Sequence, residues 1–181
     1  KVLALNFANG VHPGGGFLGG ARAQEECLCR SSALYATLAG DDMYAYHASR
    51  LLPDSSDWSI LSPDVPVFRT DDGTFIDKPY LLHFITSAAP YAPTVGQAQS
   101  QKLMESRIQR VLSIAWAYGY DSLVLGAWGC GAFAIDPEAI ALQFRSALEG
   151  AFSGCFSRVH FAIADWSDER RFLGPFARVF S

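Results

Sequence analysis

The 181-residue sequence has little of the basic charge or the long apolar runs that mark several classes of protein. Lys and Arg total 14 against 18 Asp and Glu, giving a formal net charge of −4. A generic nucleic-acid-binding face is basic, so this balance argues against one, while a local pocket for one small anionic ligand stays open. No apolar run approaches the ~18 residues of a membrane-spanning helix, and no signal-peptide pattern opens the chain.

Cysteine is also scarce and shows no disulfide spacing. Cys27 and Cys29 are separated by one residue, and Cys130 and Cys155 lie far away. A tetrahedral metal site needs a second pair of cysteines or a histidine cluster, and neither is present in the sequence. We therefore predict reduced thiols in an intracellular, cytoplasmic protein.

Length and composition indicate one well-packed domain over residues 1–181. Half of the residues are hydrophobic and 18% are charged, and a chain of this size can bury a sizeable core. The sequence starts with Lys1 and then directly with an apolar strand, where Met and polar residues are more usual. We expect that an N-terminal segment has been removed.

The hydrophobic pattern predicts alternating strands and helices, with a surface loop over residues 53–63 and an Asp-Gly hairpin turn at 71–73. Such alternation favours a sheet covered by helices on its faces. The expected strands span residues 2–7, 65–69, 80–86, 122–125 and 159–164; the expected helices span 24–38 and 97–118, followed by one after Asp136 and a short one near the C-terminus.

Two of these helices have clear sequence signals. The helix at 97–118 carries a stripe with steps of 4, 3, 4 and 3 residues, which predicts one buried face: Met104, Ile108, Val111, Ala115 and Tyr118. Asp136, Pro137 and Glu138 are typical of a helix start, because Asp caps the first amides and Pro fits the first turn.

Both glycine-rich loops of the chain follow directly after an apolar strand. The first covers residues 10–20 and the second covers 126–133. Ligands of open α/β sheets bind beyond the carboxyl ends of the strands. We therefore expect the two loops to lie side by side and to line one cleft.

The second loop places Gly126, Gly129 and Gly131 between a strand and a helix. Backbone N–H groups freed by such a turn can hold phosphate oxygens without a cationic side chain. The loop is neither a Walker loop nor a G-x-G-x-x-G loop. A tight strand-to-helix connection with packing glycines is the alternative interpretation.

The first loop repeats this design with Gly14, Gly15 and Gly16, and two such loops beside one sheet suit a diphosphate with sugars at both ends. Asn9, just beyond the first strand, has an amide that can pair with a sugar hydroxyl. Asparagine before glycine is also a common turn former, so both interpretations of Asn9 stay open.

Glu25 and Glu26 follow the first loop at the start of a helix, where the macrodipole alone favours acids. Adjacent helical residues point ~100° apart, so the two carboxylates cannot be equivalent. Like charge and burial raise the pKa of one carboxyl, and a protonated Glu near neutral pH is a general acid for glycosidic cleavage. A Glu-Glu pair does not match the spacing of two-carboxylate glycosidases, so a single acid/base Glu is favoured.

Gly14-Gly15-Gly16, seven residues, and then Gln24-Glu25-Glu26 resemble the signature of poly(ADP-ribose) glycohydrolases. The stretches NFANGVHPGGGFLGGARAQEE and GAWGCGAF resemble the bacterial, microbial-type branch, and the similarity spans nearly the whole chain. The resemblance implies a three-layer α/β/α macrodomain with a mixed central sheet. It also implies ADP-ribose as the bound product and poly(ADP-ribose), or ADP-ribosylated protein, as the substrate.

The resemblance further implies residue roles. Glu26 would be the catalytic acid/base, and Glu25 would bind hydroxyls of the riboses at the cleaved bond, as a second catalytic residue. No metal or cofactor is implied, and we expect a monomer that releases ADP-ribose from chain ends. The implied ADP-ribose-binding residues are Asn9, Gly14, Gly15, Gly16, Gln24, Gly129, Cys130, Gly131, Ala132 and Phe133, with Phe133 packing on the terminal ribose.

Two alternatives use the same residues. One is an enzyme that removes single ADP-ribose groups from protein or nucleic acid, and the other is a module that binds ADP-ribose without cleaving it. Paired acids argue against the binding module. Only eight residues precede Asn9, so the adenine contacts stay unassigned, as does the role of Tyr91.

Overall fold

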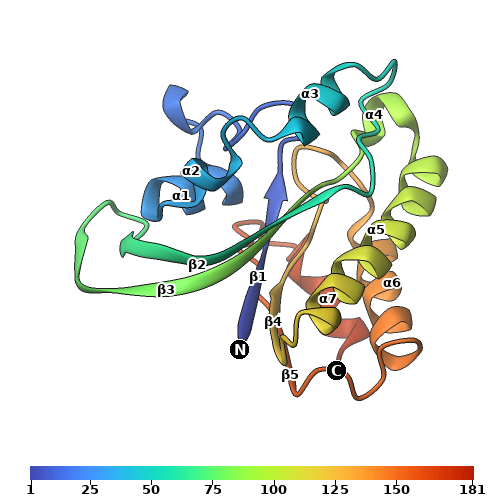
Figure 1. Ribbon diagram of the computed structural model, residues 1–181. Coiled ribbons are helices and arrows are strands. Elements are labelled where there is room, and N and C mark those ends of the chain that lie inside the picture. Colours follow the sequence, from blue (N-terminus) through green and yellow to red (C-terminus); the bar gives the residue numbers. More distant parts are fainter.

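The central feature of the computed structural model, which describes residues 1–181, is a five-stranded mixed sheet (Figure 1). The strand order is β2-β3-β1-β4-β5. β1 is parallel to both β3 and β4, and β4 is parallel to β5, whereas β2 is antiparallel to β3. The strands are β1 Val2–Ala8, β2 Ser59–Arg69, β3 Phe75–Ala88, β4 Ser122–Leu125 and β5 Arg158–Phe161.

Helices cover both faces of this sheet, which confirms the predicted α/β/α layering with a mixed sheet (Figure 1). α5, α6 and α7 pack on one face through a large core that contains Leu3, Leu5 and Ile85. α1, α2 and α3 lie on the other face over a smaller core that contains Ala4 and Phe84. The helices are α1 Gln24–Ser31, α2 Leu34–Leu38, α3 Asp42–Ala48, α4 Ala92–Val95, α5 Gln97–Ala117, α6 Pro137–Glu149 and α7 Leu173–Val179, with a 3-10 turn at Phe17–Gly19.

The predicted helix over 24–38 is divided into α1 and α2. Ser32 between them is extended and forms a β-bridge with Val67, and the Ala33 N–H donates to Pro66 O. Pairing with the edge strand therefore supplies hydrogen bonds that a continuous helix would have made within itself. The uninterrupted helix was wrong, because this pairing partner lies more than thirty residues away in sequence.

The predicted surface loop at 53–63 was wrong in its second half, where β2 already begins at Ser59. β2 and β3 are both longer than predicted, and the polar residues of β2 reflect its position at the sheet edge. Pro66 is tolerated there, because an edge strand does not need every N–H for pairing. α3 and α4 were not predicted, and β5 ends at Phe161, before the predicted end at 164.

The two helix signals are largely confirmed. Met104, Ile108, Val111 and Ala115 are buried on α5, but Tyr118 is exposed, because the helix ends at Ala117 before the stripe reaches it. The predicted helix start at Asp136 is confirmed, because the Asp136 side chain accepts a hydrogen bond from Glu138 N at the start of α6. None of the helices combines the length and apolarity needed to cross a membrane.

Candidate active site

The two glycine-rich loops lie next to each other, as predicted, because β1 and β4 are parallel neighbours whose carboxyl ends share one edge of the sheet (Figure 1). A side-chain contact joins the end of β1 directly to the second loop. The Phe7 ring, at the end of β1, packs so closely on Gly126 that a Cβ at position 126 would lie 2.9 Å from Cζ of Phe7. The site is therefore built where the sequence places both loops.

Gln24 fixes the start of α1 to β1. Its Oε1 accepts from Phe7 N at 2.8 Å, and its Nε2 donates to Leu5 O at 2.7 Å. The Gln24 side chain thus bonds to the backbone of β1 as a neighbouring strand would. This contact places Glu25 and Glu26 near the carboxyl end of β1. Direct ligand binding by Gln24 stays a prediction, and in this structure its amide is engaged by the backbone.

Glu25 is 3% exposed, and both of its carboxylate oxygens have donors. Oε1 accepts from Asn6 Nδ2 at 3.2 Å, and Oε2 accepts from Asn9 N at 2.6 Å. The pKa of Glu25 is raised from an ordinary 4.5 to about 7, chiefly by burial and also by nearby Glu26, while the donors from Asn9, Asn6 and Gly14 limit the rise. Glu25 is therefore a carboxyl that can carry a proton near neutral pH.

Glu26 has one engaged oxygen and one free oxygen. Oε1 accepts from Gly16 N at 3.0 Å, whereas Oε2 is buried and has no partner within the chain. The backbone at Gly15, with φ +58°, comes so close that a Cβ there would overlap Glu26 Oε1. The first loop therefore needs glycine in order to wrap over the carboxylates, and it leaves a single acid oxygen unpaired.

Asn9 fits both interpretations of its role. Its Oδ1 accepts from Val11 N and His12 N, each at 2.9 Å, which is the turn-forming arrangement. Its Nδ2 donates to no group of the chain, and the residue is half-buried. The turn therefore uses only the acceptor of Asn9, and the predicted contact with a sugar hydroxyl can use the donor.

In the second loop, the backbone amides of Gly129, Gly131, Ala132 and Phe133 have no acceptor in the chain, nor do those of Gly126 and Ala127 at its start. Two hydrogen bonds close the loop behind them, from Ala134 N to Gly131 O and from Ile135 N to Gly129 O. Successive free N–H groups of this kind form a concave anion site. The geometry favours the phosphate interpretation of this loop over a purely structural connection.

Cys130 differs from its neighbours in this loop. Its N–H donates to Ala127 O, its side chain is 1% exposed, and burial raises the pKa of its thiol to about 12. Cys130 is therefore a packing residue here, and its predicted contact with ADP-ribose stays untested. Gly131 and Ala132 are exposed on the outer side of the loop.

Phe133 is held edge-on by Tyr91, whose role the sequence did not reveal. The two ring centroids are 6.0 Å apart with an interplanar angle of 90°, an arrangement that aromatic pairs favour. In addition, Ala92 N donates to Phe133 O. The segment after β3 therefore positions the ring that the resemblance places against the terminal ribose.

Sequence reasoning missed two sets of buried polar residues behind the site. Asn6 and Thr86 lie side by side in β1 and β3, each fully buried. A polar residue inside the apolar stretch VLALNFA was the available signal for Asn6. His47 and Arg107 form the second set, and nothing in the sequence marked them.

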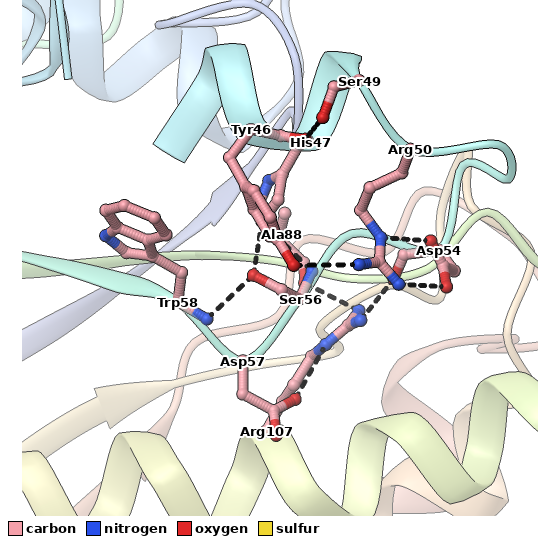
Figure 2. Close-up of polar contacts among 10 residues, drawn as sticks. All are labelled: Tyr46, His47, Ser49, Arg50, Asp54, Ser56, Asp57, Trp58, Ala88 and Arg107. Carbon is pink, nitrogen blue, oxygen red and sulfur yellow. Dashed lines mark hydrogen bonds and ion pairs between the residues drawn. The ribbon is translucent and has the colours of Figure 1, made fainter. Parts of the chain in front are cut away.

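His47 and Arg107 both bind the strap, which we define as residues 49–58 (Figure 2). His47 Nε2 accepts from Ser56 N at 3.1 Å, so its Nδ1 carries the proton and donates to Gly10 O at 3.0 Å. Burial lowers the pKa of His47, which favours this neutral form. The strap and the start of the first loop are thereby joined.

Arg107 reaches the strap from α5 and is completely buried (Figure 2). It donates to Ala88 O at 2.9 Å and to Asp54 O, and its Nε lies 3.6 Å from Asp57 Oδ1. Within the strap, Arg50 and Asp54 form a bidentate pair with two distances of 2.7 Å. Pro53 O also accepts from Tyr91 N, so the strap supports both loops.

Two of the cavities in the structure lie away from this edge. One of about 350 Å³ is lined by residues of α1, β2 and β3, including Leu28, Arg69 and Tyr80. Its lining contains no residue of the two loops, so we assign the site from hydrogen-bonding chemistry. The single cleft expected between the loops stays a prediction. No cluster of His, Cys, Asp and Glu side chains suits a metal ion.

Comparisons with known proteins agree with the geometry of the candidate active site. The family model of the microbial-type poly(ADP-ribose) glycohydrolase catalytic domain matches residues 1–70. The poly(ADP-ribose) glycohydrolase of Thermomonospora curvata is 44% identical with a TM-score of 0.95, over 99% of this chain and 68% of that one. A search of curated proteins found no match.

Structures of related enzymes with ligands are equally similar. The Thermomonospora curvata enzyme bound to the inhibitor ADP-HPD is 44% identical with a TM-score of 0.93, over 98% of this chain and 70% of that one. The Deinococcus radiodurans enzyme in complex with ADP-ribose is 42% identical with a TM-score of 0.93, over 99% of this chain and 75% of that one. Similarity at this level across nearly the whole chain shows that the chain belongs to the microbial-type poly(ADP-ribose) glycohydrolase family.

Proposed function

We propose that this chain hydrolyses the ribose–ribose O-glycosidic bonds of poly(ADP-ribose) from chain ends and releases ADP-ribose. The observation that carries the proposal is the unpaired, buried Oε2 of Glu26, held by the loop after β1, while the loop after the neighbouring strand β4 has free amides among residues 129–133. A lone acid oxygen next to an anion site suits a glycosidic bond close to a diphosphate. Family membership supports the same reaction.

In the proposed reaction, protonated Glu26 gives its proton from Oε2 to the oxygen that links the two riboses. The bond between that oxygen and the ring carbon of the terminal ribose breaks, and the remaining polymer leaves with a hydroxyl group. The Glu26 carboxylate then takes a proton from a water molecule, whose oxygen bonds to the ring carbon. The product is ADP-ribose, and Glu26 ends the cycle protonated.

Glu25 is proposed to bind ribose hydroxyls, since a carboxylate can accept about four hydrogen bonds and the chain supplies donors from Asn6 and Asn9. The pKa of about 7 at Glu25 favours a second assignment, in which Glu25 supplies the proton. The position of the free oxygen on Glu26 favours the first. The two assignments predict different kinetics for the two Glu→Gln variants.

The test follows free ADP-ribose released from labelled, auto-modified poly(ADP-ribose). We expect Glu26→Gln to lower kcat about 10²- to 10⁴-fold, as for loss of a general acid/base. Glu25→Gln should raise KM more than it lowers kcat. Glu105→Gln, on the exposed side of α5, is the matched control and should leave both constants unchanged. The reverse pattern at Glu25 and Glu26 would assign the proton to Glu25.

Other outcomes would replace the proposed reaction. Polymer that stays intact while single ADP-ribose groups are removed from protein would indicate a mono-ADP-ribosyl hydrolase. Tight binding of ADP-ribose without turnover of either substrate would indicate a binding module. The intracellular location expected from the cysteines stays a prediction.

A further inference from the structure

Asn6 is a fully buried amide in the central strand, between Glu25 and Thr86. Its Nδ2 lies 3.2 Å from Glu25 Oε1 and 3.1 Å from Thr86 Oγ1. Thr86 is the direct register partner of Asn6 in the parallel pair of β1 and β3. The three side chains therefore form a row that crosses from β3 through β1 to the first turn of α1.

An apolar residue would be expected at position 6. Ala4, two residues earlier and so on the same face of β1, belongs to the smaller core, as does Phe84 beside Thr86 on β3. Burying an amide costs free energy, and here the cost is only partly offset because Asn6 Oδ1 has no partner. In the folded protein, the Asn6 amide nitrogen therefore donates hydrogen bonds, whereas its amide oxygen accepts none.

Within the candidate site, the Asn6 Nδ2 group donates a hydrogen bond to one residue, Glu25. Glu25 accepts from a single side chain, that of Asn6, and its other donors are the backbone amides of Asn9 and Gly14. Without Asn6, the Oε1 atom would lose the donor that lies 3.2 Å from it. The backbone amides would remain, but no side-chain donor would fix the plane of the carboxylate.

We propose that Asn6 is a positioning residue that holds the Glu25 carboxylate in its ionised form and in the plane required to accept ribose hydroxyls, with Thr86 orienting the Asn6 amide. The ribose contact in this statement rests on the proposed function above. The link between Asn6 and Glu25 does not, since both residues are present in the free protein.

The charges around Glu25 define what the loss of Asn6 should do. Burial and Glu26 raise the pKa of Glu25, and the Asn6 donor lowers it. Cys29 on α1 and Tyr44 on α3 also face Glu25, and burial raises the pKa of each, so both stay neutral in the relevant pH range. Removal of the Asn6 donor should therefore move the pKa of Glu25 above 7.

The first experiment is a carboxyl ¹³C NMR titration of the whole chain, with the Glu25 signal assigned by its loss in Glu25→Gln. In Asn6→Leu, which keeps the volume and removes the donor, we expect the pKa of Glu25 to rise by about one unit. Thr86→Val keeps the donor and should give a smaller rise. Ile85→Val perturbs the opposite face of β3 and should leave the pKa unchanged.

The second experiment measures kcat/KM for ADP-ribose release against pH. Asn6→Leu should be about fivefold below wild type at pH 7 and within about twofold at pH 9, where Glu25 is ionised in both proteins. A merely structural role would lower activity equally at both values. Asn6→Ala, which removes the donor without adding an ionisable group, serves if Asn6→Leu does not fold.

The results separate the two claims. Identical Glu25 titrations in wild type and in the folded Asn6 variants would overturn the positioning role, whatever the enzyme does. A wild-type chain that releases no ADP-ribose would overturn the proposed function, while the NMR titration would still decide the role of Asn6. A loss of activity that does not depend on pH would count against the positioning role.

Discussion

The two glycine-rich loops leave adjacent parallel strands, yet their backbone amides have different partners. In the first loop, amides of Asn9 and Gly16 donate to Glu25 and Glu26. In the second loop, most amides have no acceptor in the chain, including those of Gly129, Gly131, Ala132 and Phe133. One loop therefore uses its backbone to hold the acids, and the other presents its backbone to a ligand.

This difference shows why glycine content alone does not indicate what a loop binds. Gly15 is required because the chain's own carboxylate lies against it, so the close approach is internal. Gly131 has open space around its α-carbon, so the second loop faces outward at that position. The sequence interpretation, in which Gly14, Gly15 and Gly16 bind ADP-ribose, omitted the carboxylates that Gly15 and Gly16 contact.

Gly15→Ala should give the largest effect, because the new Cβ would overlap Glu26 Oε1 and the residue has φ +58°. We expect turnover to fall about a thousandfold, equal to about 4 kcal/mol, through displacement of the acid. Gly20→Ala is the matched control, with φ +88° but no neighbour within 4 Å. Equal losses in the two variants would show that backbone strain, not contact with the acid, explains glycine in the first loop.

Arg107→Met tests whether Arg107 and the strap together support the two loops. The change leaves the Asp57 carboxylate and the carbonyls of Ala88 and Asp54 without their buried donor. We expect the free energy of unfolding in urea to fall by about 3 kcal/mol. Arg110→Met, at an exposed position of the same helix, should change it by less than ~0.5 kcal/mol. A stability equal to wild type would contradict the role of Arg107 behind both loops.

Glu25→Gln tests the cost of the buried acid through pH-dependent stability. Because the folded state raises the pKa of Glu25 from 4.5 to about 7, the folded state binds the proton more tightly than the unfolded chain. This contribution is fully present below pH 4.5 and is lost as pH rises through about 7. Relative to Glu25→Gln, wild type should therefore lose on the order of 2 to 3 kcal/mol between pH 4 and pH 8.

Urea unfolding of both proteins at several pH values measures that difference, and it removes the contributions of groups common to the two. Glu105→Gln is the exposed control and should track wild type. Parallel stability curves for wild type and Glu25→Gln would mean that Glu25 is ionised without cost in the folded protein. The amides of the first loop would then not have to offset the free-energy cost of burying an ionised Glu25.

Phe133→Ala should give the smallest effect and concerns the second loop. We expect kcat to fall about tenfold while the affinity for ADP-ribose changes by less than about threefold, since the ring is proposed to orient the ribose and the amides to hold the diphosphate. Tyr91→Phe keeps the edge-on aromatic pair and should be close to wild type. A large loss of affinity with unchanged kcat would show that Phe133 binds and does not orient.

Local signals in the sequence predicted much of the fold correctly. The apolar runs of β1 and β4, the stripe of α5 and the cap at Asp136 each depend on neighbouring residues, and each was found at its predicted place. The adjacency of the two loops followed as well, because parallel strands share their carboxyl edge. Errors arose where a distant partner decided the structure, as for Ser32 with Val67 and for the extension of β2 along β3.

The candidate site likewise contains some residues that local sequence patterns indicate and others that depend on distant partners. The sequence indicated Glu25, Glu26 and both loops, but Asn6, His47 and Arg107 each have a hydrogen-bond partner 37 to 80 residues away. No local pattern records such a pairing. The contact of Tyr91 with Phe133 was likewise invisible until the two segments were brought together by the fold.

The sequence by itself determined that two carboxylates at a helix start follow a glycine loop, and that they cannot be equivalent, because helical geometry separates neighbouring side chains. Only the tertiary structure decided how they differ. Packing against β1 buries Glu25 between two donors and raises its pKa to about 7, while Gly16 takes one oxygen of Glu26 and leaves the other free. Burial and hydrogen bonding depend on residues far apart in the chain, and these set the chemistry of each acid.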